Sequence, residues 1–506
     1  MISKEILDTY EMTIGIECHV QLATKTKLFS TADNDSRDAE PNSNVVPIDY
    51  GLPGMLPILN WEAVKLAVKA GKALGSEVAL RSHFDRKHYF YPDLPKGYQT
   101  TQMYEPIIGA GLVEAPLEDG TTVAVRIHHA HMEEDAGKLT HFDGYSLVDL
   151  NRAGTPLIEI VSEPDIHSSA AARTFATELY RLMTYAGVTH GDLYHGNMRF
   201  DVNISVAKKG ATELGKRAEV KNLNSFRSVE RAAEYEFGRQ VELLEKGERV
   251  VQETRGWDDA KQITLSQRSK EDAQDYRYMP DPDIPPIVLT QQEIEEIQKD
   301  TPMLPSEYRQ HWAQLDLDQS VMSVLLDHQP VAEVIDALAE VLYNEHSNNK
   351  SWVTDDLGID EKTFAKLVKR VCNWFVSTPS EQMNFTRVAE GFVGPVRLAK
   401  LALLVEQNKL SSTSAKEIFL YLFQEDSRGK MPEDIAKERN LLQVSDTSAV
   451  ASIVDEVLAD PSSAKALEDI RAGNDKAIGF LVGQVMKKSK GQANPAMAQE
   501  LIRERL

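Results

Sequence analysis

The sequence has 506 residues, of which 42% are hydrophobic and 26% charged, and its formal net charge is −22 at pH 7. A chain of this length is too long to fold around a single hydrophobic core, so we expect a soluble globular protein of about two to four domains. The negative charge argues against a protein that coats nucleic acid without specificity.

The two cysteines exclude a disulfide framework and indicate a reducing compartment. The polar start of the chain does not resemble a secretory signal, and no apolar run reaches the ~18 residues that a membrane span needs. We therefore expect a cytoplasmic protein without a membrane partner.

Three segments, at residues 14–22, 199–206 and 217–221, alternate apolar and polar side chains. This period of two predicts strands with one apolar and one polar face. The polar faces carry Glu17 and His19, then Asp201 and Asn203, then Glu219 and Lys221. Such a face is either an ordinary solvated surface or a site, and a histidine beside carboxylates and an asparagine favours a site.

Cys18 and His19 are neighbours in the first segment, which suggests a thiol–imidazole pair. Neighbours on a strand point to opposite faces, so the two side chains cannot meet. We expect Cys18 in the core, and we expect His19 to be either a ligand or a structural residue.

Residues 84–99 interleave the cations Arg86, Lys87 and Lys96 with aromatic side chains. Cations beside aromatic rings suit phosphates and stacked bases, as at single-stranded nucleic acid sites or around an adenine. The alternative is an aromatic core. Arg152 and Arg277 are similar single candidates for phosphate contacts.

The octapeptide HMEEDAGK at residues 131–138 holds Glu133, Glu134 and Asp135 in a row. Adjacent carboxylates repel one another unless a cation lies among them, although an isolated acidic turn can also be solvated. Acidic residues recur in other structured segments, at Glu17, Glu159 and Asp201. Oxygen ligands from several strands suit a hard cation such as Mg²⁺, which commonly accompanies phosphates.

The later part of the chain has helical patterns. A proline-rich stretch at residues 281–286 marks a boundary, and apolar spacing of three and four predicts helices at 291–299, 331–343 and 362–376. We expect three domains, at residues 1–290, 291–410 and 411–506.

Local signals predict two helix starts in the last domain. Ser414 and Glu417 form a capping-box pair, and Asn494 precedes a proline suited to the first helical position.

Residues 471–506 have seven basic and three acidic residues, a net charge of +4. Lys487, Lys488 and Lys490 end a helix predicted to begin near Asn474. These lysines either contact phosphates or cap the helix and keep a small domain soluble.

Common signatures are absent from the sequence. There is no GxxxxGK[ST] loop, no complete dinucleotide loop, no zinc-spaced cluster and no glycine–serine element of an amidase nucleophile. Any use of ATP would therefore depend on a carboxylate-lined metal site.

Seven motifs together resemble one family. They are IGIECHVQL (14–22), FDRKHYFYPDLPKGYQ (84–99), HMEEDAGK (131–138), SLVDLNRAGTPLIEIVSEPD (146–165), AEVKNLNSF (218–226), DYRYMPDPD (275–283) and GFLVGQVMKKSKGQANP (479–495). In this order they closely resemble the B subunits of bacterial aspartyl/glutamyl-tRNA(Asn/Gln) amidotransferases.

The resemblance implies an α+β fold. Its N-terminal cradle would surround a curved antiparallel sheet, like that of glutamine synthetase, and all-α helical and tail domains would follow. The tail would bind tRNA, with Lys487, Lys488 and Lys490 as the expected contacts.

The resemblance also implies a ligase that uses glutamine as its amide donor. ATP would phosphorylate the side-chain carboxylate of misacylated Glu-tRNA(Gln) and/or Asp-tRNA(Asn), and ammonia would replace the phosphate. An amidase A subunit would supply the ammonia, and a small C subunit would complete a heterotrimer. The sequence leaves the choice between the two tRNAs open.

The resemblance assigns roles to residues, and charge neutralisation around ATP is the main task. It implies Mg²⁺ ligands at Glu17, His19, Glu133, Glu134 and Glu159, with Asp201 and Glu219 as weaker candidates. It implies catalytic roles for Glu17, Glu133, Glu134 and Lys138. It implies ATP or phosphate contacts at Arg86, Lys87, Arg152, Asp201, Asn203, Glu219 and Lys221.

Two other functions fit parts of the sequence. A non-catalytic tRNA-binding or assembly factor explains the basic tail but not the repeated carboxylates. A stand-alone carboxylate–amine ligase explains the carboxylates but not the helical domains and the basic end.

Overall fold

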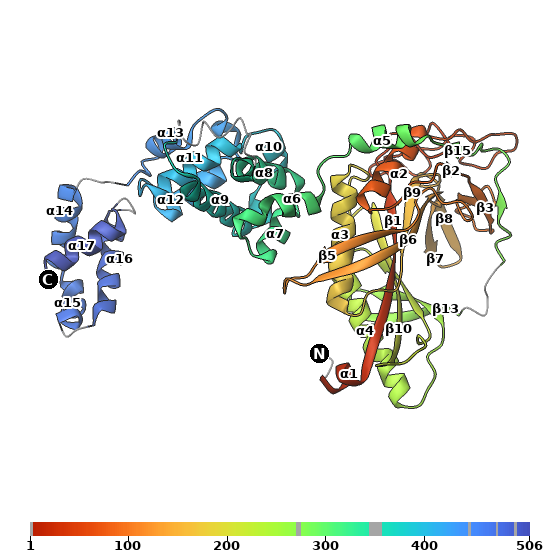
Figure 1. Ribbon diagram of the computed structural model, residues 1–506, viewed down its shortest axis with the longest axis horizontal. Coiled ribbons are helices and arrows are strands. Elements are labelled where there is room, and N and C mark those ends of the chain that lie inside the picture. Colours follow the sequence, from red (N-terminus) through yellow and green to blue (C-terminus); the bar gives the residue numbers. More distant parts are fainter. Residues whose placement is uncertain (1–3, 270–274, 344–356, 444–446, 472–473, 490–492) are drawn as a thin grey trace. The chain divides into compact units, whose positions relative to one another are not determined.

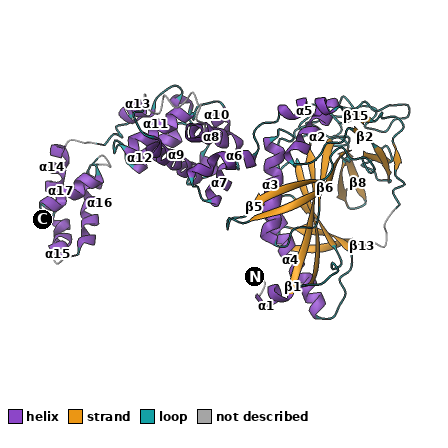
Figure 2. Cartoon of the chain, viewed as in Figure 1, coloured by secondary structure: helices purple, strands orange, loops and turns teal. Residues whose placement is uncertain are grey.

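The computed structural model describes residues 4–269, 275–343, 357–443, 447–471, 474–489 and 493–506 (Figure 1). The chain divides into two compact units, Met1–Pro305 and Ser306–Leu506. The first unit mixes strands with helices, and the described part of the second contains helices without strands (Figure 2). The α+β prediction is therefore confirmed.

Within the described residues, the first unit is built on an eight-stranded sheet. In spatial order the strands are β13 (Ile263–Ser269), β12 (Glu253–Asp258), β11 (Ala218–Leu223), β10 (Met198–Lys208), β1 (Tyr10–Gln21), β9 (Pro156–Ser162), β6 (Thr122–Glu134) and β5 (Gly111–Pro116). The neighbouring strands run antiparallel except β11 and β12, which are parallel. This pair corrects the prediction of an antiparallel sheet.

The alternation in the sequence determines the two faces of this sheet. Ile14, Ile16 and Cys18 are completely or almost completely buried, as are Phe200 and Val202 on β10. Each large apolar side chain of this kind contributes about 1.5–3 kcal/mol by leaving water. The predicted strand phase and the core position of Cys18 are both confirmed.

Helices α3 (Ser169–Tyr185) and α4 (Phe226–Glu245) cover the apolar face, where they pack against each other and against strands of the sheet (Figure 1). Helix α4 also connects β11 to β12, and parallel neighbours need such a crossover. The opposite, polar face of the sheet is thereby left for a site.

Smaller elements lie around this sheet. They are α1 (Lys4–Thr9), α2 (Trp61–Ala73), α5 (Gln291–Lys299), the three-stranded sheet β14 (Met279–Pro280)–β3 (Asp85–His88)–β4 (Tyr98–Thr101), the pair β15 (Ile287–Val288)–β2 (Arg81–Ser82) and the hairpin β7 (Lys138–Phe142)–β8 (Tyr145–Asp149). The side chains of Lys69 and Lys72 on α2 donate to carbonyls at the end of α5. The predicted helix at 291–299 therefore belongs to the first unit.

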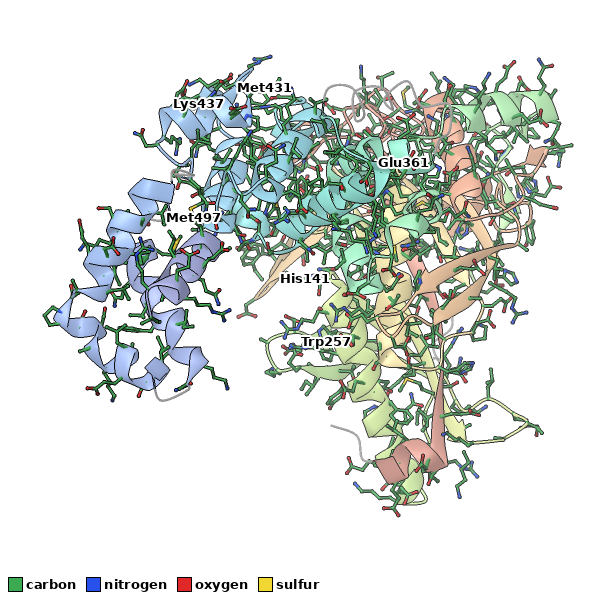
Figure 3. All side chains as sticks on the ribbon, turned by 60° about the vertical axis from the view of Figure 1, so that its left-hand side comes forward. His141, Trp257, Glu361, Met431, Lys437 and Met497 are labelled. Atoms are coloured by element: carbon green, nitrogen blue, oxygen red, sulfur yellow. The ribbon has the colours of Figure 1, made fainter. Side chains whose placement is uncertain are left out.

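The second unit contains the other predicted helices. Its helices are α6 (Pro305–His311), α7 (Gln319–Leu325), α8 (Gln329–Tyr343), α9 (Glu361–Val376), α10 (Phe385–Ala389), α11 (Pro395–Glu406), α12 (Ser412–Tyr421), α13 (Pro432–Glu438), α14 (Thr447–Leu458), α15 (Ala464–Arg471), α16 (Ile478–Lys488) and α17 (Pro495–Glu504). Helices α12 and α13 pack on α11, whereas α14, α16 and α17 share a separate core. Met497 packs against that core (Figure 3).

Two predicted helix starts have different outcomes. Asn494 caps α17 with Pro495 in the first turn, as predicted. The capping box at Ser414 and Glu417 is wrong, because Ser411 is the N-cap of α12 and accepts from the Ser414 N–H. Among the described residues, no helix is long and apolar enough to cross a membrane.

Candidate functional site

The polar face of the sheet gathers acidic side chains around the central strand β1. In the strand register, Glu17 lies directly opposite Asp201 of β10, and His19 lies directly opposite Glu159 of β9. Side chains directly opposite each other on one face lie about 5 Å apart at Cβ. Residues far apart in the sequence therefore converge here.

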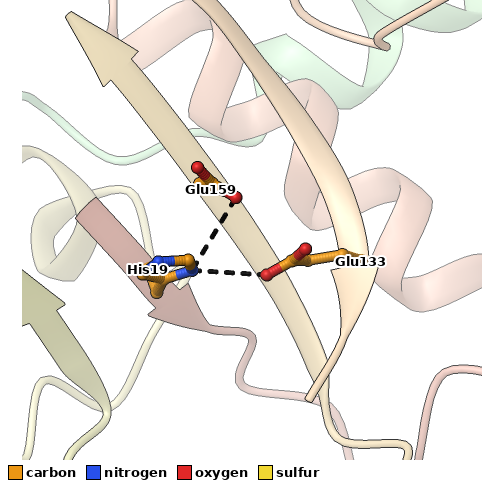
Figure 4. A group of neighbouring side chains, drawn as sticks. All are labelled: His19, Glu133 and Glu159. Carbon is orange, nitrogen blue, oxygen red and sulfur yellow. Dashed lines mark ion pairs between the residues drawn. The ribbon is translucent and has the colours of Figure 1, made fainter. Parts of the chain in front are cut away.

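His19, Glu133 and Glu159 form the first of two acidic groups on this face (Figure 4). Their ligand atoms all lie within 4.8 Å of one another. Nδ1 of His19 is 3.3 Å from Glu133 Oε1 and 4.0 Å from Glu159 Oε2. Nε2 of His131, on the neighbouring strand β6, is 3.4 Å from Glu159 Oε2.

The carboxylates favour positive charge on His19. Burial lowers the pKa of this imidazole, but Asp201, Glu133 and Glu159 outweigh burial and raise the pKa well above its usual value. Burial alone would raise the pKa of Glu159, but His131 and His19 hold it well below its usual value. This part of the site is therefore a network of opposite charges.

The second group consists of Glu17, Asp201 and Glu219, again with ligand atoms within 4.8 Å of one another. Lys221 Nζ lies 2.8 Å from Asp201 Oδ2 and 3.0 Å from Glu219 Oε1. The Asn203 side-chain amide donates to Glu17 Oε1 at 2.9 Å. Burial, and then the other carboxylates, raise the pKa of Glu17.

The donor set fits hard cations. Carboxylate oxygens are the ligands that Mg²⁺ prefers, and imidazole is less usual for Mg²⁺. Among the described residues, Asn203 Oδ1 is buried without a hydrogen bond, and His19 Nδ1 is buried with the Glu133 and Glu159 carboxylate oxygens at 3.3 and 4.0 Å. Buried polar atoms are normally satisfied, so these two atoms are suited to a ligand in each group.

Glu134 does not belong to either group. Its carboxylate accepts hydrogen bonds from Lys96 Nζ and from the Thr100 N–H, and both carboxylate and ammonium are largely buried. Glu134 follows Glu133 on β6, and neighbours on a strand point to opposite faces. The two glutamates therefore have different surroundings.

Other predicted residues do not belong to either group. Lys138 is exposed at the start of β7. Arg86 pairs with Asp281 and Asp283. Arg152 donates to the carbonyls of residues 136 and 137. Lys87 lies over an aromatic ring, and its charge helps to lower the pKa of Glu159, which burial alone would raise.

Sequence reasoning missed two cations of this face. Arg199 Nη2 lies 2.8 Å from Asp135 Oδ2, and His131 contacts Glu159. The signal was present, because Arg199 is two residues before Asp201 and His131 is two residues before Glu133, on the same faces of their strands.

A cavity of about 220 Å³ opens beside the second group. Its lining includes Gly15, Glu17, Val161, Asn203, Leu214 and Arg217. The cavity thus has apolar walls, a cation and one end of the carboxylate cluster. Gly215 allows close approach here, because a Cβ at this position would lie 2.1 Å from the Val206 carbonyl oxygen.

The predicted tRNA-binding lysines lie in the second unit. Lys487 and Lys488 occupy the last turn of α16, and Lys488 Nζ pairs with Glu456 at 2.7 Å. The helix begins at Ile478, after a 3₁₀ turn at Asp475–Ala477, slightly later than predicted. Lys490 lies outside the described residues.

Comparison with known proteins identifies the family. Residues 12–295 match the family described as the GatB/GatE catalytic domain, and residues 360–506 match the GatB domain. The chain is 42% identical over 500 residues to the B subunit of the aspartyl/glutamyl-tRNA(Asn/Gln) amidotransferase of Caldicellulosiruptor saccharolyticus, and the match covers 98% of this chain and 99% of the relative. The chain is also similar to the B subunit from Halorhodospira halophila, with 43% identity over 98% of this chain and 99% of the relative. It is 41% identical to the B subunit from Trichodesmium erythraeum, over 98% of each chain. The chain therefore belongs to the family of aspartyl/glutamyl-tRNA(Asn/Gln) amidotransferase B subunits.

Proposed function

We propose that this chain catalyses the ATP-dependent amidation of misacylated Glu-tRNA(Gln) and/or Asp-tRNA(Asn). The substrate's side-chain carboxylate attacks the γ-phosphorus of ATP and displaces ADP, and ammonia then displaces phosphate from the acyl phosphate to form the amide. Family membership supports the reaction class. The observation that carries the proposal is the pair of acidic groups meeting across β1 beside a cavity.

The acidic groups suit the electrostatic demand of this reaction. Two anions, a carboxylate and a triphosphate, must approach each other, so their charge must be neutralised. We infer that Mg²⁺ is held by His19, Glu133 and Glu159 and by Glu17, Asp201 and Glu219. When bound, Mg²⁺ supplies positive charge to the phosphate oxygens.

Cationic side chains of the protein neutralise part of the remaining negative charge. Lys221 forms ion pairs with both Asp201 and Glu219, and Arg199 forms an ion pair with Asp135 on the same face of the sheet. These ion pairs orient the carboxylates before any ligand arrives, which reduces the reorganisation needed during the reaction. Lys87, whose charge acts on Glu159, is our preferred phosphate contact, since Arg86 is already paired with two carboxylates.

The cavity beside the second group suits the nucleotide. Val161 and Leu214 offer apolar walls to an adenine, and Arg217 offers a cation. Glu17 and Asn203 line the same cavity and place its inner end at the carboxylates. A nucleotide there would direct its phosphates toward the second acidic group.

Ammonia must come from elsewhere, because the sequence lacks an amidase nucleophile element. The relatives are named as the B subunits of amidotransferases, which implies that other subunits accompany them. We infer a glutaminase A subunit and a small C subunit as partners, and we infer that the basic end of the chain binds tRNA through Lys487, Lys488 and Lys490.

The test is amide formation by the purified chain with its amidase partner. Each misacylated tRNA is supplied with and without ATP, and ATP consumption is measured in parallel. We expect amide and ADP only when misacylated tRNA and ATP are both present. ATP use with free glutamate or aspartate and not with tRNA would instead indicate a small-molecule ligase, and amide formation without ATP use would contradict the mechanism.

A further inference from the structure

We propose that an exposed aromatic surface beside the acidic groups binds the single-stranded 3′ end of the acyl-tRNA, with Phe90 and Arg277 as its outer contacts. This surface consists of Lys87, Phe90, Tyr91, Tyr276 and Arg277, and we call it the aromatic surface. The inference rests on the proposed function and identifies where that substrate enters.

The aromatic surface is assembled from two distant parts of the sequence. Strand β3 pairs with β14, and the His88 N–H donates to the Tyr276 carbonyl at 2.8 Å. Across this junction, Lys87 Nζ lies 4.9 Å from the ring centroid of Tyr276, and Arg277 Cζ lies 6.0 Å from that of Phe90. Cations and rings therefore alternate along one surface.

The outer rings are exposed. Phe90 is 77% exposed and Tyr91 56% exposed. A core role, which the sequence left open for this segment, does not explain side chains that remain in water. Aromatic rings interleaved with cations are the usual surface for unpaired nucleotides, since every base has a π-face and every linkage a phosphate.

The backbone at Arg277 is held in an uncommon conformation. Its φ is +46°, in the left-handed region that non-glycine residues rarely adopt. The Asp275 carboxylate accepts from the Arg277 N–H at 3.0 Å, and His88 Nδ1 contacts the Arg277 carbonyl at 3.1 Å. Strain that neighbours maintain in this way commonly serves to present a side chain.

The inner end of the aromatic surface reaches the acidic groups. Lys87 of β3 lies directly opposite Gln99 of β4. The Gln99 side-chain amide donates to Glu133 Oε2 at 3.1 Å. The first acidic group therefore lies at the end of this surface.

This placement matches the shape of the proposed substrate. The amino acid is attached to the last ribose of an unpaired 3′ segment, so that segment must pass beside the acidic groups while the helical stem stays outside. Stacking is tolerant of sequence, which suits a segment that both substrate tRNAs share. The adenine of ATP has a separate candidate site, the cavity lined by Leu214 and Arg217.

The first experiment measures binding of uncharged tRNA to the full-length complex, using tRNA with an intact 3′ end and the same tRNA lacking its last three nucleotides. Removing one stacking base contact costs about 5- to 150-fold in affinity. We expect the wild type to lose at least about fivefold on truncation of the tRNA. Phe90→Ala should bind intact tRNA more weakly and show a smaller difference in affinity between the two tRNAs than the wild type.

Matched variants separate stacking from general damage. Phe90→Tyr should retain the discrimination, because it keeps the ring. Trp61→Ala removes another partly exposed aromatic ring of the same unit, at the start of α2, and should behave as wild type. Discrimination as large as that of the wild type in both Phe90→Ala and Arg277→Ala would overturn the inference.

The second experiment measures steady-state amidation. Phe90→Ala and Arg277→Ala should raise the KM for misacylated tRNA and leave the KM for ATP and the glutaminase rate unchanged. A raised KM for ATP alone would assign the surface to the nucleotide and overturn the inference. Absence of amidation by the wild type would instead contradict the proposed function, and the binding experiment would still test the surface.

Discussion

Replacing Glu133 or Glu134 with glutamine should have different consequences, although the two residues are neighbours. Glu133→Gln removes a charged ligand from the first acidic group, and we expect cation affinity to fall at least about 100-fold, since even partners outside the ligand set contribute 10- to 100-fold. Glu134→Gln leaves the buried ammonium of Lys96 without its ion pair. Breaking such a pair costs about 3 kcal/mol, which would lower the thermal midpoint of the N-terminal unit by roughly 5 °C.

Two measurements distinguish these effects. Mn²⁺ or Mg²⁺ titration reports cation affinity, and thermal unfolding of the metal-free chain reports stability. The Lys96→Met, Glu134→Met double variant is the control, because removing both buried charges restores most of the lost stability. Equal loss of cation affinity in both single variants, with no difference in thermal midpoint, would refute the reasoning from strand geometry.

The remaining predictions concern His19, β1 and the tail. The pKa of His19 is raised, so its ion pairs stabilise the metal-free chain fully at pH values below the ordinary titration range of histidine, and this stabilisation is lost as pH rises through the raised pKa. Cation binding at Nδ1 should release a proton, so cation affinity measured by titration calorimetry should rise with pH. The same dependence of affinity on pH in His19→Gln would contradict this. Cys18→Ala should lower the free energy of unfolding by about 1 kcal/mol and leave amidation intact. Glu17→Ala should stop ATP-dependent amidation. A folded but inactive Cys18→Ala variant would contradict the assignment of these two side chains to opposite faces of the strand. Deleting residues 447–506 should weaken tRNA binding, and the slope of log affinity against log salt should become shallower by about one unit for each phosphate that the tail neutralises. The deletion should not disturb α12 and α13, which pack on α11. Identical affinities and slopes for the full-length and shortened chains would show that the tail does not bind tRNA.

Local periodicity predicted the central part of the site. The alternation at 14–22 and 199–206 is sufficient to place Glu17 and His19 on one face and Cys18 on the other, because strand geometry reverses side-chain direction at each residue. The pairing of His19 with Glu159 could not be predicted in this way, because strand register depends on contacts between distant segments.

Other features needed tertiary information. The run Glu133-Glu134 reads as one acidic motif, and only the position of both residues on β6, with Lys96 on the far side, separates their roles. Residues 411–414 contain three serines, so several helix starts satisfy the same local rule and packing selects Ser411. The parallel pair β11–β12 follows from the helix between them, a signal that residue alternation alone does not carry.

Both acidic groups depend on one strand, and this limits how the chain can change. Glu17 and His19 are two residues apart on β1, so the peptide repeat sets their spacing at about 6.7 Å. Substitutions leave that interval unaltered, whereas inserting or deleting a single residue between Tyr10 and Glu17 would either bulge the strand or send both side chains into the core. Over evolution β1 should therefore accept exchanges of its apolar residues but keep a constant length, because the strand fixes the distance between the two acidic groups.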